Sequence, residues 1–313
     1  MGKIAFIFPG QGAQYIGMAM DFIEGNAELE NILNDFDKKN NTDLFKIMSD
    51  GPEEKLKETK FTQPAILFHS IAAMRTVLNE IKIIPDYVAG HSLGEFSALV
   101  ANGVLTLEDA MYLVHKRGEF MIKANEGKPF AMAAIIGPSP EEIKDICAEA
   151  SKVDVVIAAN FNTPVQTVIS GSKAGVEKAC EIAKERKAKR VVPLVVGGPF
   201  HSPLITKAAT WLAEEMNNIN FKKTTIPVVS NVNAKPVIDT GNIKINLAKQ
   251  VTSSVLWVDS IKFMIEDGVD TFIEFGPKKV LAGMLKKIDK NVKVISIDTI
   301  ETFELVKSNL ETL

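Results

Sequence analysis

Gly90-His91-Ser92-Leu93-Gly94 is the stretch that decides the fold of this chain. A short apolar run, 87–90, precedes it, and a stretch with a helical pattern, 94–100, follows directly. A G-x-S-x-G sequence between a strand and a helix predicts a sharp turn with the serine hydroxyl exposed at its tip. Backbone N–H groups at the start of the helix favour a negative oxygen. We predict that Ser92 is a nucleophile and that the N–H of Leu93 stabilises an oxyanion; a plain turn with a capping serine is the alternative.

A serine hydroxyl is a weak nucleophile and needs a base. The chain has four histidines, at positions 69, 91, 115 and 201. His69 and His115 lie in apolar helical stretches, where a buried structural role is the better interpretation, and the side chain of His91 should point away from the serine. His201 lies in a loop between a predicted strand and a helix, where α/β proteins place chemistry. Elimination therefore favours His201 as the base, with a helix-start residue as the alternative.

Strands and helices alternate on both sides of this turn, which predicts a mainly parallel sheet covered on both faces. Between them, residues 128–196 follow the order β-α-β-β-α-β, which is typical of a ferredoxin-like unit. We therefore predict an α/β protein with a large domain formed by residues 1–127 and 197–313 and a small domain formed by residues 128–196. The predicted strands are 3–8, 87–90, 130–136, 153–160, 166–170, 190–196, 227–230 and 271–275. The predicted helices are 17–22, 28–36, 64–78, 94–100, 107–124, 139–150, 173–187, 203–216, 243–250, 258–267 and 280–288.

The glycine turn Pro9-Gly10-Gln11-Gly12 follows the first strand and suggests a dinucleotide site. That fingerprint needs a third glycine at position 15, which is Tyr15, so we reject it. In serine acyl-transfer enzymes a second N–H donor comes from a loop after a neighbouring strand. Gln11 fits this position, and an ordinary tight turn fits it equally well.

The composition limits the classes of partner. The chain has 313 residues, 46% of them hydrophobic and 24% charged, and a net charge of −3. A net negative chain does not favour nucleic acid as the main partner. The two cysteines form no CxxC pair or Cys/His cluster, so neither a disulfide framework nor a zinc site is indicated. No apolar run is long enough for a signal peptide or a membrane span. We expect a cytoplasmic protein without a membrane or nucleic-acid partner, and a monomer.

Six short strings occur in an order and spacing that resemble the malonyl-CoA:acyl-carrier-protein transacylases of bacterial fatty-acid synthesis and the acyltransferase domains of polyketide synthases. The resemblance covers nearly the whole chain. The strings are Phe8-Pro9-Gly10-Gln11-Gly12, Thr62-Gln63-Pro64-Ala65, Gly90-His91-Ser92-Leu93-Gly94-Glu95, Arg117-Gly118, Gly198-Pro199-Phe200-His201-Ser202 and Phe275-Gly276-Pro277.

This resemblance implies an α/β-hydrolase-like large domain with a ferredoxin-like insertion, and transfer of a malonyl group from malonyl-CoA to acyl carrier protein without a cofactor or metal. It implies Ser92 as nucleophile, His201 as base, and the backbone carbonyl of Gln250 as the group that orients the base. The implied oxyanion donors are the N–H groups of Gln11 and Leu93. The implied substrate-binding residues are Arg117, Gln63, Met121, Asn160, Asn162 and Phe200. A chain of this length favours fatty-acid over polyketide synthesis.

Arg117 stands out on chemistry alone. Only four of the 36 basic residues are arginines, so an arginine inside an apolar helical stretch is a meaningful choice. A guanidinium can bind a carboxylate through two parallel hydrogen bonds, which lysine cannot do. A surface arginine, or one paired with Glu95 or Glu119, is the alternative. Phe200 matches the bulky residue of malonyl-selective relatives, and a filled pocket of this kind discriminates by about 1–3 kcal/mol.

Two other functions share these features. A hydrolase would deliver the acyl group to water, but hydrolases of this fold usually carry an acid between serine and histidine, and no such acid stands out. A carrier-protein scaffold with a degenerate site would not keep all of the predicted catalytic residues. One position departs from the family pattern: Ser254 stands where a proline is common, which loosens the turn after Gln250.

Overall fold

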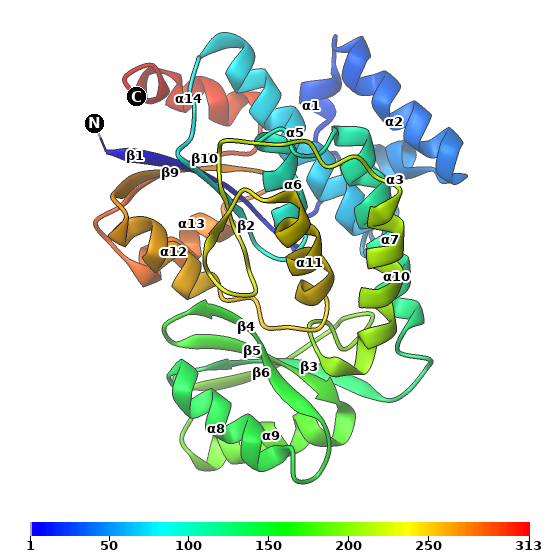
Figure 1. The fold of residues 1–313 in the computed structure, drawn as a ribbon, viewed down its shortest axis with the longest axis vertical. Helices are drawn as coiled ribbons and strands as arrows, with labels where there is room; N and C mark the ends of the chain where they lie inside the picture. Colours follow the sequence, from blue (N-terminus) through cyan, green and yellow to red (C-terminus); the bar gives the residue numbers. More distant parts are fainter. Residues whose placement is uncertain (1) are drawn as a thin grey trace.

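The computed structural model describes residues 2–313 as two sheets with helices around them (Figure 1). The larger sheet has the strand order β10-β9-β1-β2-β7-β8. Its neighbouring strands pair in parallel, except that β8 pairs antiparallel to β7. Its strands are β1 (Lys3–Phe8), β2 (Tyr87–Gly90), β7 (Val228–Val229), β8 (Pro236–Val237), β9 (Val269–Phe275) and β10 (Lys293–Ile297).

Helices cover both faces of this sheet, as the apolar runs of its strands require. In β1, Phe6 and Phe8 face the core formed with α5, α6 and α7, whereas Ala5 and Ile7 face the core formed with α12 and α13. The helices are α1 (Met20–Ile23), α2 (Ala27–Asn40), α3 (Leu44–Asp50), α4 (Glu53–Leu56), α5 (Thr59–Glu80), α6 (Gly94–Ala101), α7 (Leu107–Lys123), α10 (Thr206–Asn217), α11 (Thr240–Gln250), α12 (Trp257–Glu266), α13 (Val280–Ile288) and α14 (Ile300–Leu310).

The smaller sheet is antiparallel and has the order β4-β5-β3-β6. Its strands are β3 (Phe130–Ile136), β4 (Val156–Thr163), β5 (Gln166–Ser172) and β6 (Arg190–Leu194). Helices α8 (Pro140–Ala150) and α9 (Lys173–Glu185) share an apolar core with this sheet and lie at the bottom of Figure 1. This order of strands and helices confirms the predicted α/β class with a ferredoxin-like unit. The boundaries at residues 128 and 196 stay a prediction.

Several elements differ from the sequence prediction. Strand β10, strand β8 and helices α3, α4 and α14 were not predicted, because their segments are short or interrupted by charged residues. The asparagines at 160 and 162 were placed at the end of a strand and in a loop, but both lie within β4 and are buried. No helix between residues 2 and 313 is long and apolar enough to cross a membrane.

Candidate active site

The Ser92 turn joins β2 to α6 at the edge of the large sheet where the parallel strands end. Ser92 has a φ of 53°, a conformation that non-glycine residues rarely adopt. A Cβ at Gly90 would lie 1.9 Å from the backbone of Gly94, and a Cβ at Gly94 would lie 2.2 Å from the carbonyl oxygen of Phe8. Both glycines are therefore required by close backbone approach. The side chain is left at the tip of the turn, as the sequence pattern predicts.

His201 lies next to Ser92 although 109 residues separate them. Its Nε2 is 2.8 Å from the Ser92 Oγ, and its Nδ1 is 2.9 Å from the carbonyl oxygen of Gln250. A carbonyl can only accept, so the Nδ1 carries the proton and the Nε2 is free to accept one from the serine. The structure thus brings together the three groups that the sequence and its family resemblance predict as nucleophile, base and orienting carbonyl.

The electrostatic surroundings keep His201 neutral at pH 7. Burial, followed by the positive charge of Arg117, lowers the pKa of His201 to about 3. Desolvation disfavours the imidazolium, and a nearby cation disfavours it further. The imidazole is therefore in the protonation state that a general base needs. Any anion that neutralises Arg117 raises the basicity of the His201 imidazole.

Arg117, from α7, is only 1% exposed and lies against Ser92. Its Nη2 donates to the Ser92 Oγ at 3.0 Å and to the Gln250 Oε1 at 2.9 Å, and its Nη1 donates to the Gln63 Oε1 at 2.8 Å. A guanidinium has five N–H donors, and these bonds use three of them. The Nε has no partner among residues 2–313. Burial lowers the pKa of Arg117 to about 10, so it stays charged at pH 7.

Two further predicted residues surround this guanidinium. Gln63 lies in α5 and is buried, and its Nε2 donates to the Met121 Sδ at 3.8 Å. Met121 lies one turn after Arg117 on α7 and is also buried. The carboxamide of Gln63 therefore bridges the arginine and the thioether.

The remaining predicted residues come from the small sheet and the loops. The Oδ1 of Asn162 is 2.8 Å from the Nε2 of His91, which places the His91 ring toward β4 and away from the nucleophile. The backbone of Asn160 forms an isolated parallel β-bridge with Val255, which lies in the loop that follows Gln250. Phe200 is buried beside Gly198, where a Cβ would lie 3.1 Å from its ring.

The loop after Gln250 is fixed despite the missing proline. The Oγ of Ser254 donates to the carbonyl oxygen of Ala158 at 2.6 Å, and the N–H of Val255 donates to the carbonyl oxygen of Ala159 at 2.8 Å. These bonds tie the loop to β4, so the turn is held by the small sheet.

Two important residues, Glu95 and Asn231, were not identified as site residues from the sequence. Asn231 accepts from the N–H of Ser92 at 2.8 Å and donates to the carbonyl oxygen of Gly90 at 2.7 Å. Glu95 accepts from the Gln250 Nε2 at 2.7 Å and from the N–H of Asn231 at 3.1 Å. A glutamate in an otherwise apolar helix was the available signal, since Glu95 is 2% exposed. This network stabilises the strained turn at Ser92.

Replacing Glu95 with glutamine should change the pH dependence of stability. Burial raises the pKa of Glu95 from 4.5 to about 7. The unfolded chain therefore loses this proton at lower pH than the folded protein, and stability falls as pH rises from 4.5 to 7. The glutamine variant lacks this loss. Its free energy of unfolding relative to that of wild type should therefore rise by about 3 kcal/mol between pH 4 and pH 8. Urea unfolding at both pH values measures this; an equal pH dependence in both proteins contradicts it.

A serine paired with a neutral histidine on a sharp strand-to-helix turn defines an enzyme class that forms acyl-serine intermediates. The chain belongs to the acyl transferase domain family, whose sequence profile matches residues 5–306.

Relatives of known function narrow this class. The chain is 44% identical over 312 residues to the malonyl CoA-acyl carrier protein transacylase of Bacillus subtilis. The aligned region covers 99% of this chain and 98% of the relative. Among solved structures, the acyl-carrier-protein S-malonyltransferase of Burkholderia pseudomallei has a TM-score of 0.93 at 41% identity, covering 98% of this chain and 99% of that one. A malonyl-transacylase solved in complex with a type II PKS acyl-carrier protein has a TM-score of 0.93 at 36% identity, with coverage of 98% and 99%.

Proposed function

We propose that this protein transfers the malonyl group of malonyl-CoA to the phosphopantetheine thiol of an acyl carrier protein, through a malonyl ester on Ser92. The observation that carries the proposal is the Arg117 guanidinium, buried and within 3.0 Å of the nucleophile Oγ. A charged donor at this distance suits an acyl group that ends in a carboxylate. A site for uncharged acyl groups would have no use for it.

In the first step, the Nε2 of His201 takes the proton of Ser92 while the Oγ attacks the thioester carbon. The carbon–sulfur bond breaks, and the imidazolium returns its proton to the leaving CoA thiolate. The Nδ1–H bond to the carbonyl of Gln250, at 2.9 Å, keeps the ring in the required orientation. The carrier-protein thiol then enters and reverses these steps, so the kinetics are ping-pong.

The N–H groups of Leu93 and Gln11 are the proposed oxyanion donors. Leu93 is the N-cap residue of α6, and backbone N–H groups at the start of a helix have no partner within it. Gln11 follows Gly10, at which a Cβ would lie 2.6 Å from the carbonyl oxygen of His91. Neither N–H donates to another group within residues 2–313. Free donors held beside the nucleophile are what a developing negative oxygen requires.

We propose that Arg117 binds the malonyl carboxylate and that the carboxylate in turn activates the base. The positive charge of Arg117 is the second largest cause of the low pKa of His201. A bound carboxylate neutralises that charge and therefore raises the pKa of His201. Correct substrate would then switch on the base, which favours malonyl over uncharged acyl groups beyond the contact itself.

The other predicted contacts complete the proposed cleft. Gln63 and Met121 support Arg117 from α5 and α7, and Asn160 and Asn162 line the mouth from the small unit, residues 128–196. Phe200, which precedes the base, would crowd an α-methyl group. We therefore propose partial selectivity against methylmalonyl-CoA, of the order of 1–3 kcal/mol.

The proposed chemistry uses no metal and no bound organic cofactor. We further propose that the protein acts as a monomer in the cytoplasm, with malonyl-CoA and acyl carrier protein as its partners and without nucleic acid or membrane. Gel filtration coupled to light scattering tests the oligomeric state directly.

Radiolabelled malonyl-CoA separates this function from its rivals. Wild-type protein should retain the label at Ser92 and pass it to phosphopantetheinylated carrier protein, and Ser92→Ala should retain none. Release of free malonate at the rate of label loss would identify a hydrolase. Absence of both labelling and turnover would identify a scaffold with an inactive site.

A further inference from the structure

The loop that carries Gln11, residues 9–19, contains no helix or strand of its own. Gly12, Gly17 and Ala19 have φ values of 104°, 87° and 66°, so the path is irregular and cannot be maintained by repeating backbone bonds. Its start lies against the nucleophile turn at His91 and against Gly276, where a Cβ would lie 2.5 Å from the Cγ of Pro9. Its conformation therefore depends on contacts from elsewhere in the chain.

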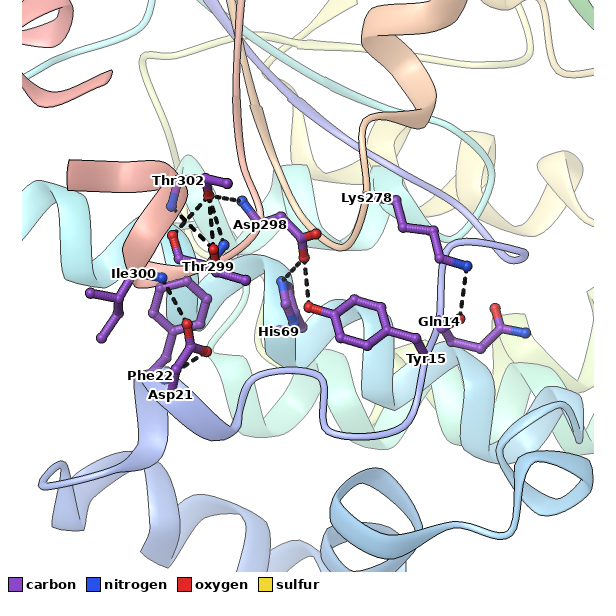
Figure 2. A network of polar contacts seen from close by, with 10 residues as sticks. All are labelled: Gln14, Tyr15, Asp21, Phe22, His69, Lys278, Asp298, Thr299, Ile300 and Thr302. Atoms are coloured by element: carbon purple, nitrogen blue, oxygen red, sulfur yellow. Dashed lines mark hydrogen bonds and ion pairs between the residues drawn. The ribbon is translucent and has the colours of Figure 1, made fainter. Parts of the chain in front are cut away.

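The central contact joins this loop to the end of β10 (Figure 2). The hydroxyl of Tyr15 donates to the Oδ1 of Asp298 at 2.8 Å, and the Nε2 of His69 lies 3.3 Å from the same oxygen. His69 comes from α5 and is fully buried. Its ring packs edge-on against Phe22, with the ring centroids 5.6 Å apart. Three segments far apart in sequence thus meet at one carboxylate.

Asp298 is ionised in this network. Burial opposes ionisation, but the adjacent His69 ring and the hydrogen bond from Tyr15 hold the pKa of Asp298 below its usual value. Burial, together with the bond to Asp298, raises the pKa of Tyr15, so the phenol keeps its proton. The bond between them is therefore a charge-assisted hydrogen bond, which is stronger than a neutral one.

A second contact from the same C-terminal region reaches the loop one residue earlier. The Nζ of Lys278 donates to the carbonyl oxygen of Gln14 at 3.2 Å (Figure 2). The Oε1 of Gln14 in turn accepts from the N–H of Gly12 at 2.8 Å. The chain of bonds therefore runs from Lys278 through Gln14 to the residue directly after Gln11.

We propose that Tyr15 and Asp298 are positioning residues that hold loop 9–19 so that the N–H of Gln11 faces the oxygen of the Ser92 adduct. The inference rests on the proposed function, because it assigns Tyr15 and Asp298 a part in acylation. Catalysis is sensitive to displacements of about 1 Å in such donors, which can cost up to about a hundredfold in rate.

Tyr15→Phe removes the tether and keeps the ring. Stopped-flow acylation by malonyl-CoA should show a burst with wild-type amplitude and a rate about tenfold lower. The affinity for malonyl-CoA, measured in a Ser92→Ala background, should be unchanged. Tyr112→Phe is the matched control, because the Tyr112 hydroxyl also donates to a carboxylate, that of Glu215, at 2.8 Å. It should acylate at the wild-type rate.

The burst amplitude separates positioning from folding, since a folding defect lowers the number of active sites rather than the rate at each site. Lys278→Met, which removes the other bond to the loop, should slow the burst in the same way if Tyr15→Phe is unstable. An unchanged burst rate in both Tyr15→Phe and Lys278→Met overturns the inference. The proposed function is tested separately, by the labelling of Ser92 in the wild-type protein. A reduced amplitude at a normal rate overturns the inference as well.

Discussion

Replacing His201 with alanine is expected to slow acylation of Ser92 by malonyl-CoA by about ten-thousand-fold. The Nε2 is the only base within hydrogen-bond reach of the Oγ among the described residues, and Arg117, the other polar side chain bonded to that oxygen, is a cation. Without the imidazole, the hydroxyl keeps its proton at neutral pH. Rapid quench of radiolabelled malonyl-enzyme measures the rate.

Chemical rescue distinguishes a missing base from a collapsed site. The side chain of His201 is buried, so its removal leaves space for added imidazole. Imidazole should restore part of the acylation rate in His201→Ala and should leave wild type unchanged. A wild-type acylation rate in the variant without imidazole would remove His201 from the mechanism.

Replacing Arg117 with alanine should lower the kcat/KM for malonyl transfer by about a hundred- to five-thousandfold while sparing transfer of acetyl groups. Loss of a buried charge partner costs about 3–5 kcal/mol, because the remaining carboxylate is left unpaired in a site with little water. Acetyl-CoA carries no such carboxylate. Parallel assays with malonyl-CoA and acetyl-CoA measure the effect, and an equal loss for both would contradict the carboxylate clamp.

Arg117→Ala should also change the pH dependence of acetyl transfer, by moving the acid limb of the pH–rate profile to higher pH. Arg117 contributes to the low pKa of His201, so its removal raises that pKa toward 6.5. The base is inactive when protonated, and acylation should therefore fail at a higher pH in the variant than in wild type. Arg117→Lys is the matched control: it keeps the charge and the low pKa but loses the fork geometry, so it should retain the wild-type acid limb with weaker malonyl transfer.

The local parts of the site could be predicted because they depend on neighbours in sequence. The turn at Ser92 needs glycines two residues before and after it, and both are visible in the chain. The start of α8 is equally local, because Ser139, Pro140 and Glu142 are neighbours in the sequence and form a capping box with proline at the first helical position. Strand β10 could not be predicted in this way, because its five residues gain their stability from pairing with β9.

The sequence by itself determined the class of fold, the sharp turn that carries Ser92 and, through six ordered strings, the family. The tertiary structure decided which partners those residues meet. Glu95 contacts Asn231 across 136 residues, and Tyr15 contacts Asp298 across 283. No local pattern encodes such pairs, because a buried carboxylate is stabilised only by donors that the completed fold brings within hydrogen-bond distance.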